Sequence, residues 1–78
     1  MHIDGRTFRF LRSSDLERDG MCFEAHEDDK QVAEVFYSDA DCSSTFTAFS
    51  DDLPTALVLY MVTEGLAQIT PVSEGDAE

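Results

Sequence analysis

Bulky apolar side chains alternate with polar ones in four short stretches of the first fifty residues. Alternation of this kind places successive side chains on opposite faces of an extended chain, and it predicts half-buried β-strands. Polar turn residues, among them Asp19-Gly20, separate the stretches. Between the first two, Ser14-Asp15-Leu16-Glu17 has the spacing of a capping box and predicts one helical turn. The predicted strands cover residues 7–12, 21–27, 32–37 and 45–49.

The register of the predicted strands follows from matching their apolar faces, because a slip of one residue inverts every side chain. Pairing Phe23 with Tyr37 leaves a three-residue loop at 29–31. Pairing Tyr37 with Phe46 leaves a two-residue turn at 41–42. Both hairpins then share one inner face, which predicts an antiparallel meander of about four strands.

Residues 51–69 are predicted to form one helix that is apolar on nearly every side. Asp51 or Asp52 is the expected N-cap, and Pro54 falls in the first turn, where its missing N–H costs nothing. Gly65 weakens the last turn and favours an earlier end. An alternative treats residues 57–62 as a buried strand, since Val, Leu and Tyr suit either structure. The Asp-Asp-Leu-Pro start favours the helix.

The apolar side chains of this helix fall into two opposed stripes when each residue advances by about 100°. A small sheet can cover only one stripe, and the pattern does not decide which one. The other stripe then needs a second surface, and oligomerisation is a usual remedy for a small core. One stripe consists of Leu53, Leu57, Tyr60 and Met61, and the other consists of Val58, Leu59, Val62, Leu66 and Ile69.

Two phenylalanines, Phe36 and Phe49, fall on the outer face of the predicted sheet beside His26 and Glu34. An outer face with two aromatic rings is not simply solvated. They lie at an exposed edge, or the loop at 13–20 packs on them, or they belong to an interaction patch.

Length and charge limit the possible classes of protein. The chain has 78 residues, of which 42% are hydrophobic, so we expect one domain at 1–71 and an acidic, disordered tail at 72–78. Seventeen acids against five bases give a formal net charge of −12, which disfavours nucleic acid and anionic membranes. Three explanations of the acidity remain: solubility in a salty cytoplasm, a basic protein partner, or mimicry of nucleic acid by a small inhibitor.

Candidate chemistry is sparse. His26 is predicted to lie across from Glu34 and diagonal to Glu24, an arrangement that suits either a solvated ion pair or an acid–base pair. Cys22 and Cys42 lack the positive surroundings of a reactive thiol. Their spacing does not match a zinc site.

Residues 39–50 begin like a calcium-binding loop. They place Ser44 at the sixth position and Ser50 at the twelfth, where such a loop needs glycine and glutamate. No run reaches the roughly 18 apolar residues of a membrane span, and no signal peptide is evident, so a cytoplasmic protein is expected. We therefore expect no metal, cofactor or catalytic residue.

Three segments carry a family resemblance: Val-Phe-Tyr-Ser-Asp at 35–39, Thr-Phe-Thr-Ala-Phe at 45–49, and Leu-Pro at 53–54 before an apolar helix. Across residues 20–69 the chain resembles small uncharacterised bacterial proteins. The resemblance implies a similar fold and supplies no activity. The chain departs from that pattern at Leu66 and Ile69, where more polar residues are expected.

These observations predict an α+β domain, an antiparallel sheet of about four strands with one C-terminal helix packed on one face. The expected role is a non-enzymatic interaction module that forms a homodimer through the helix near residues 53–69. The alternative is an inhibitor or immunity-type protein whose acidic surface binds a basic partner, and an enzyme would need a pocket around His26. The expected interaction residues are Val58, Leu59, Val62, Leu66, Ile69, Phe36 and Phe49.

Overall fold

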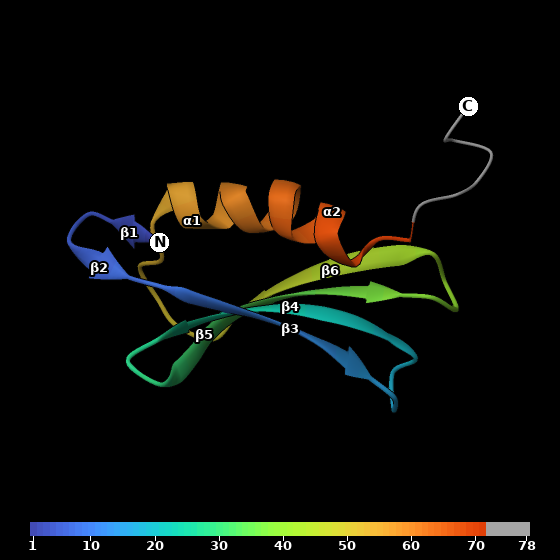
Figure 1. The fold of residues 1–78 in the computed structure, drawn as a ribbon. Helices are drawn as coiled ribbons and strands as arrows, with labels where there is room; N and C mark the ends of the chain where they lie inside the picture. The colour runs from blue at the N-terminus through green and yellow to red at the C-terminus, as the bar shows by residue number, and fades with distance from the viewer. Residues whose placement is uncertain (72–78) are drawn as a thin grey trace.

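The structure, a computed structural model, describes residues 1–71 of the chain. Four antiparallel strands form one sheet in the order β3-β4-β5-β6, which confirms the predicted meander. One helix crosses a single face of that sheet, so the α+β architecture is also confirmed (Figure 1). The tail predicted at 72–78 lies outside the described residues. The strands are β3 (Arg9–Asp15), β4 (Gly20–Glu27), β5 (Lys30–Ser38) and β6 (Ser43–Ala48).

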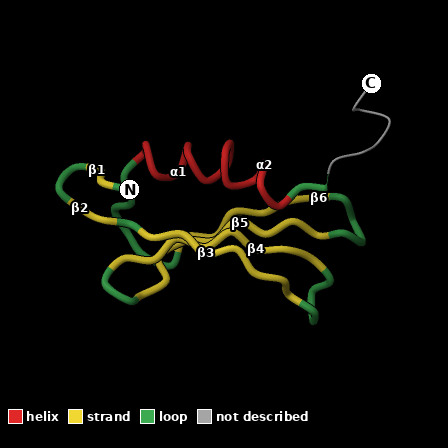
Figure 2. The backbone as a smooth tube through the Cα atoms, viewed as in Figure 1, coloured by secondary structure: helices red, strands yellow, loops and turns green. Residues whose placement is uncertain are grey.

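A short N-terminal hairpin, made of β1 (His2–Ile3) and β2 (Arg6–Thr7), precedes the sheet and was not predicted (Figure 2). Arg6 ties this hairpin to two other segments. Its Nε and Nη2 donate to the two carboxylate oxygens of Glu27, at 2.8 and 2.7 Å. Its Nη1 donates to the backbone oxygen of Asp52, at 2.9 Å, in the loop before the helix.

The strand register differs from the predicted one by two residues in both hairpins. Phe23 pairs with Val35, and Val35 pairs with Phe46. A slip of two residues keeps every side chain on its predicted face, because the side-chain period is two. The slip in the first hairpin combines the bulge at Ala25/His26 with the turn that follows β4, where Asp28 and Asp29 have φ angles of 52° and 64°. This left-handed pair forms a tighter, two-residue turn than the three-residue loop expected.

Two loops also differ from expectation. The predicted helical turn is absent, because Ser14 lies in β3 and pairs with Met21. The capping pattern is satisfied differently: Asp15 Oδ1 accepts from the backbone N–H of Arg18, at 3.1 Å, within the turn that follows β3. The loop between β5 and β6 has four residues, 39–42, instead of two.

The predicted helix forms, and the alternative strand at 57–62 is wrong. The helix consists of α1 (Thr55–Tyr60), a π-helical turn η1 (Met61–Gly65) and α2 (Leu66–Ile69). Neither Asp51 nor Asp52 caps it. Pro54 occupies the N-cap position without a side-chain bond, and Asp52 has a φ of 58°. None of the helices among residues 1–71 is long and apolar enough to span a membrane.

The π turn keeps one side of the helix on the sheet for its whole length. Leu57, Met61, Gly65 and Ile69 recur at every fourth residue, and all four are buried. In a regular helix of 3.6 residues per turn, twelve residues would rotate Ile69 by about 120° from Leu57. The wider turn absorbs this rotation. The helix therefore continues past Gly65 instead of ending there.

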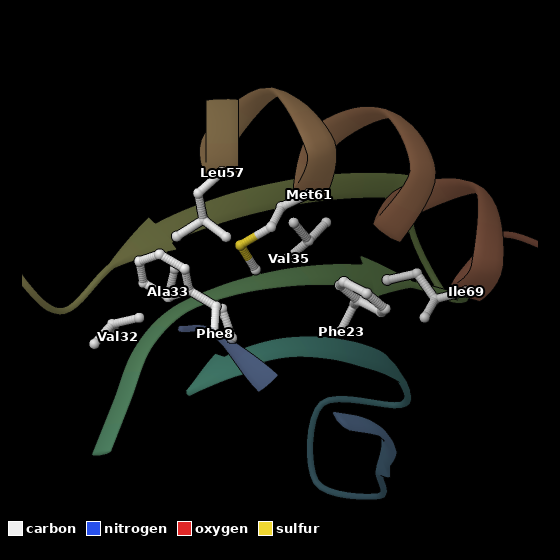
Figure 3. Packing of buried hydrophobic residues seen from close by; sticks show 9 residues of the cluster. Phe8, Phe23, Val32, Ala33, Val35, Leu57, Met61 and Ile69 are labelled. Atoms are coloured by element: carbon white, nitrogen blue, oxygen red, sulfur yellow. The ribbon is translucent and has the colours of Figure 1, made fainter. Parts of the chain in front are cut away.

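The core lies between the helix and the inner face of the sheet, and the helix rests mainly on β4 and β5. Phe10 of β3 stacks on Phe23, with ring centroids 5.3 Å apart, and Tyr60 of the helix lies 5.0 Å from Phe10. The predicted inner face is therefore confirmed. The buried cluster consists of Phe8, Phe23, Ala25, Val32, Ala33, Val35, Leu57, Met61 and Ile69 (Figure 3).

Candidate functional site

The stripe that contains Leu57 and Met61 faces the sheet. The sequence pattern had not decided which of the two stripes does so. Leu57 and Met61 are fully buried. On the other stripe, Leu59 is 60% exposed and Val62 is 37% exposed. Ile69 was assigned to this second stripe, but it is 4% exposed and lies in the core. The π turn explains that correction, because it rotates the end of the helix toward the sheet.

The remaining apolar residues lie along one flank of the helix. Tyr60 contacts Phe10 of β3, so the flank of the helix that carries Tyr60 points toward the β3 edge of the sheet. Val58 lies about 200° away around the helix axis. Val62 and Leu66 follow Val58 at successive turns, on the flank toward β6. Val58 and Leu66 are half-buried.

The exposed surface of the helix is almost free of charge. Between Thr55 and Ile69, Glu64 is the only residue that carries a charge at neutral pH. The exposed residues include Ala56, Leu59 and Val62. In a chain with a net charge of −12 this surface stands out as uncharged and partly apolar.

The turn between β3 and β4 covers the part of the outer face around Phe36. The guanidinium of Arg18 lies over the ring of Phe36, 4.2 Å from its centroid. Phe36 is only 8% exposed, so it is packed and does not form part of an open interaction patch. Packing by the loop at 13–20 was one of the three expected outcomes. Phe49, at the end of β6, is 52% exposed and stays available.

Arg18 also neutralises buried acid on this face. Its Nη1 and Nη2 donate to the Glu34 carboxylate at 3.2 and 3.3 Å. Its Nε donates to Asp15 Oδ2, at 2.5 Å. Hydrogen bonding from Arg18 lowers the pKa of Asp15. Glu34 is 8% exposed, and burial of a carboxylate needs such a partner.

A hollow of about 600 Å³ opens beside this cluster, and Arg18, Cys22, Glu24 and Glu34 are among its lining residues. Ligand atoms of Cys22, Glu24 and Glu34 lie within 4.8 Å of one another, close enough to hold a metal ion. Arg18 already supplies the positive charge there, and its Nη2 lies 3.4 Å from Cys22 Sγ. Burial, with the Glu34 carboxylate nearby, raises the pKa of Cys22 to about 11. The thiol is therefore protonated at neutral pH and is a poor nucleophile.

His26 does not face Glu34. A bulge at Ala25/His26 pairs it with Gln31, and its Nε2 lies 3.0 Å from Glu24 Oε1. Its side chain is 16% exposed, so the expected solvated position is wrong. The contact with Glu24 is the part of the predicted arrangement that is present. The His26–Glu24 pair places a hydrogen-bond acceptor beside the hollow, but it contains no nucleophile.

Residues 39–50 form a turn and a strand instead of a cation-binding loop. The turn is closed by the N–H of Asp41, which donates to Ser38 Oγ at 3.3 Å. Cys42 has a φ of 54°, and β6 begins at Ser43. The pattern at Asp39 and Asp41 is therefore explained by turn formation.

One surface feature was missed by the sequence interpretation: β6 is an edge strand without a charged residue. The signal was present as the run of nine uncharged residues from Cys42 to Ser50. Its meaning depends on the strand order, because an uncharged strand in the middle of a sheet is ordinary.

Comparisons with protein-family models, with curated proteins and with solved structures find no match to this chain. The resemblance of residues 20–69 to small bacterial proteins therefore stays a prediction. Inference about function rests on the surfaces described above.

Proposed function

We propose that this chain is a small, acidic, non-enzymatic interaction module that self-associates through its helix. The observation that carries the proposal is the exposure of Leu59 and Val62 on a helix with a single charge. Val58 and Leu66 extend the same apolar surface toward β6. Phe36 and Ile69 are not part of it, because both are buried.

Electrostatics favours this surface for contact between copies. Two molecules that each carry a net charge of −12 repel one another through most of their surfaces. The repulsion is weakest where the surface carries no charge. Burial of apolar side chains there contributes a favourable free energy of about 25 cal/mol per Å². The same burial supplements the small core of a chain of this size.

Sedimentation equilibrium or light scattering at micromolar concentration tests the proposal. We expect a monomer–dimer equilibrium for the natural chain, and we expect Val62→Glu to shift it at least tenfold toward monomer, because the new carboxylate must be desolvated in the interface. Leu11→Glu is the matched control. Leu11 is 50% exposed on β3 and gains the same charge away from the helix, so its dimer should persist.

A natural chain that stays monomeric up to high micromolar concentration would contradict the proposal. Equal weakening by Val62→Glu and Leu11→Glu would assign the effect to net charge and not to the helix surface.

A basic protein partner is the second candidate, and one arrangement of acids favours it. The N–H of Asp39 donates to the backbone oxygen of Asp19, at 3.0 Å, which joins the two turns at one end of the sheet. Glu17 and Asp41 lie in the same turns. Within residues 1–71 these four acids form no ion pair. Binding of a basic protein there would weaken steeply as salt rises.

A further inference from the structure

Within residues 1–71, the outer edge of β6 pairs with no other strand, and the fold defines where its backbone groups point. The N–H of Phe49 donates to the backbone oxygen of Val32 in β5, at 2.8 Å. Backbone groups of successive strand residues point to opposite sides, so the odd-numbered residues of β6 face β5. Ser44, Phe46 and Ala48 therefore direct their N–H and C=O groups away from the sheet.

This edge lacks the devices that normally prevent strand pairing. Charged side chains, proline and bulges protect most edge strands. β6 has none of these and pairs regularly with β5. Five of its six residues are exposed, and the helix rests on β4 and β5 instead. The opposite edge, β3, carries Arg9, Arg12 and Asp15.

The charges that flank β6 define a symmetric window. Asp41 precedes the uncharged run and Asp51 follows it. Phe46 lies midway between these two acids. When two copies pair antiparallel about Phe46, all of β6 meets uncharged residues of the other copy. In any other register, Asp41 or Asp51 of one copy lies opposite a residue of the uncharged run, 42–50, of the other copy.

We propose that a second copy of this chain pairs with β6, antiparallel and centred on Phe46, to form one continuous eight-stranded sheet. The three outward residues of each copy then exchange six N–H···O bonds with the other copy. Thr45 lies opposite Thr47 of the partner copy on the outer face. The two-fold axis is perpendicular to the sheet, so both helices lie on the same side.

This pairing rests on the proposed self-association and extends it beyond the helix. The helix is roughly 22 Å long, and a stripe about 10 Å wide along it covers roughly 220 Å². Stable interfaces bury about 800 Å² on each partner. The helix surface alone would therefore support only weak association. Pairing of β6 adds the strand edge and brings the flanks with Val58, Val62 and Leu66 toward the two-fold axis, above the two Phe46 rings.

Disulfide cross-linking tests the register. In a Cys42→Ser background, we expect Thr45→Cys with Thr47→Cys in one chain to give nearly complete disulfide-linked dimer on mild oxidation. Residues opposite one another in a non-hydrogen-bonded pair have Cα atoms about 4.5 Å apart, within disulfide range. Neither single variant should cross-link alone, whereas a mixture of the two should give the mixed dimer.

Ser44→Pro gives an independent measurement. The N–H of Ser44 points outward, so proline there leaves the β5 ladder intact. We expect its thermal unfolding to be nearly unchanged and its dimer dissociation constant to rise at least tenfold, since each copy loses one donor and gains a ring at the interface. Ser44→Ala, which keeps the N–H, should dimerise like the natural chain.

The outcomes separate this pairing from helix-mediated association. If the natural chain dimerises but the double variant does not cross-link, or if Ser44→Pro dimerises normally, the β6 pairing is refuted and the helix proposal stands. Cross-linking of either single variant alone would refute the register centred on Phe46. A chain that never dimerises refutes both proposals.

Discussion

Within residues 1–71, aspartate occupies five of the six non-glycine positions where φ is positive. This left-handed conformation costs most L-residues roughly 1–2 kcal/mol, and aspartate tolerates it because its short side chain can bond to the local backbone. Part of the acidity of this chain therefore has a conformational reason, independent of salt or of a partner. The five are Asp4, Asp19, Asp28, Asp29 and Asp52.

Gly65 is needed for the close approach of helix and sheet. A Cβ atom at this position would lie 2.5 Å from Cδ2 of the Phe23 ring. Alanine normally favours a helix over glycine by about 1 kcal/mol. Overpacking against the buried ring outweighs that gain, so we expect Gly65→Ala to lower the free energy of unfolding by about 1–3 kcal/mol.

Urea denaturation measures this effect, and Gly65→Ala combined with Phe23→Leu should recover part of the loss. A stabilised single variant would show that the helix does not approach the ring so closely.

The N-terminal hairpin, the end of β4 and the loop before the helix meet at Arg6. Hydrogen bonding from Arg6 lowers the pKa of Glu27 below its ordinary value of 4.5. A carboxyl with a lowered pKa in the folded state stabilises the fold above its unfolded pKa, and that stabilisation is lost as pH falls through the folded value. We therefore expect the Arg6–Glu27 contribution to be constant at neutral pH and to decline below about pH 4.5.

Thermal unfolding of the natural chain and of Glu27→Gln between pH 7 and pH 3 isolates this contribution. Protonation of the other acids is common to both proteins, so only the difference in melting temperature reports on Glu27. The difference should shrink as pH falls. A difference that is independent of pH would contradict a role for the ionised carboxylate.

Self-association and acidity act against each other in the whole molecule. Each copy has a net charge of −12, and the two proposed contact surfaces are nearly uncharged. Raising the salt concentration from 0.1 M to 1 M shortens the screening length from about 10 Å to about 3 Å. We therefore expect dimerisation to strengthen several-fold with sodium chloride, in sedimentation equilibrium experiments.

The opposite sign distinguishes a basic partner, since attraction between opposite charges weakens with salt. Dimerisation that weakens as salt rises would show that charge pairing holds the copies together, which is incompatible with an uncharged interface.

Much of the fold follows from local patterns. Alternation placed the strands, and a two-residue side-chain period preserved the inner face even though the register slipped by two at Phe23 and Val35. The turn residues did not reveal the register, because Asp28-Asp29 is compatible with loops of several lengths. Leu57 and Met61 were grouped correctly, since their spacing is helical before the π turn begins.

Long-range packing determined the rest. Ile69 belongs to the core because the helix widens at the π turn, and no local signal in the sequence marks that widening. Phe36 is covered by Arg18 of the loop at 13–20, one of the outcomes that the pattern left open. The importance of β6 depends on the order of the strands. Periodicity thus specified which face of each element is apolar, while the identity of the surface covering that face depended on contacts between segments far apart in the chain.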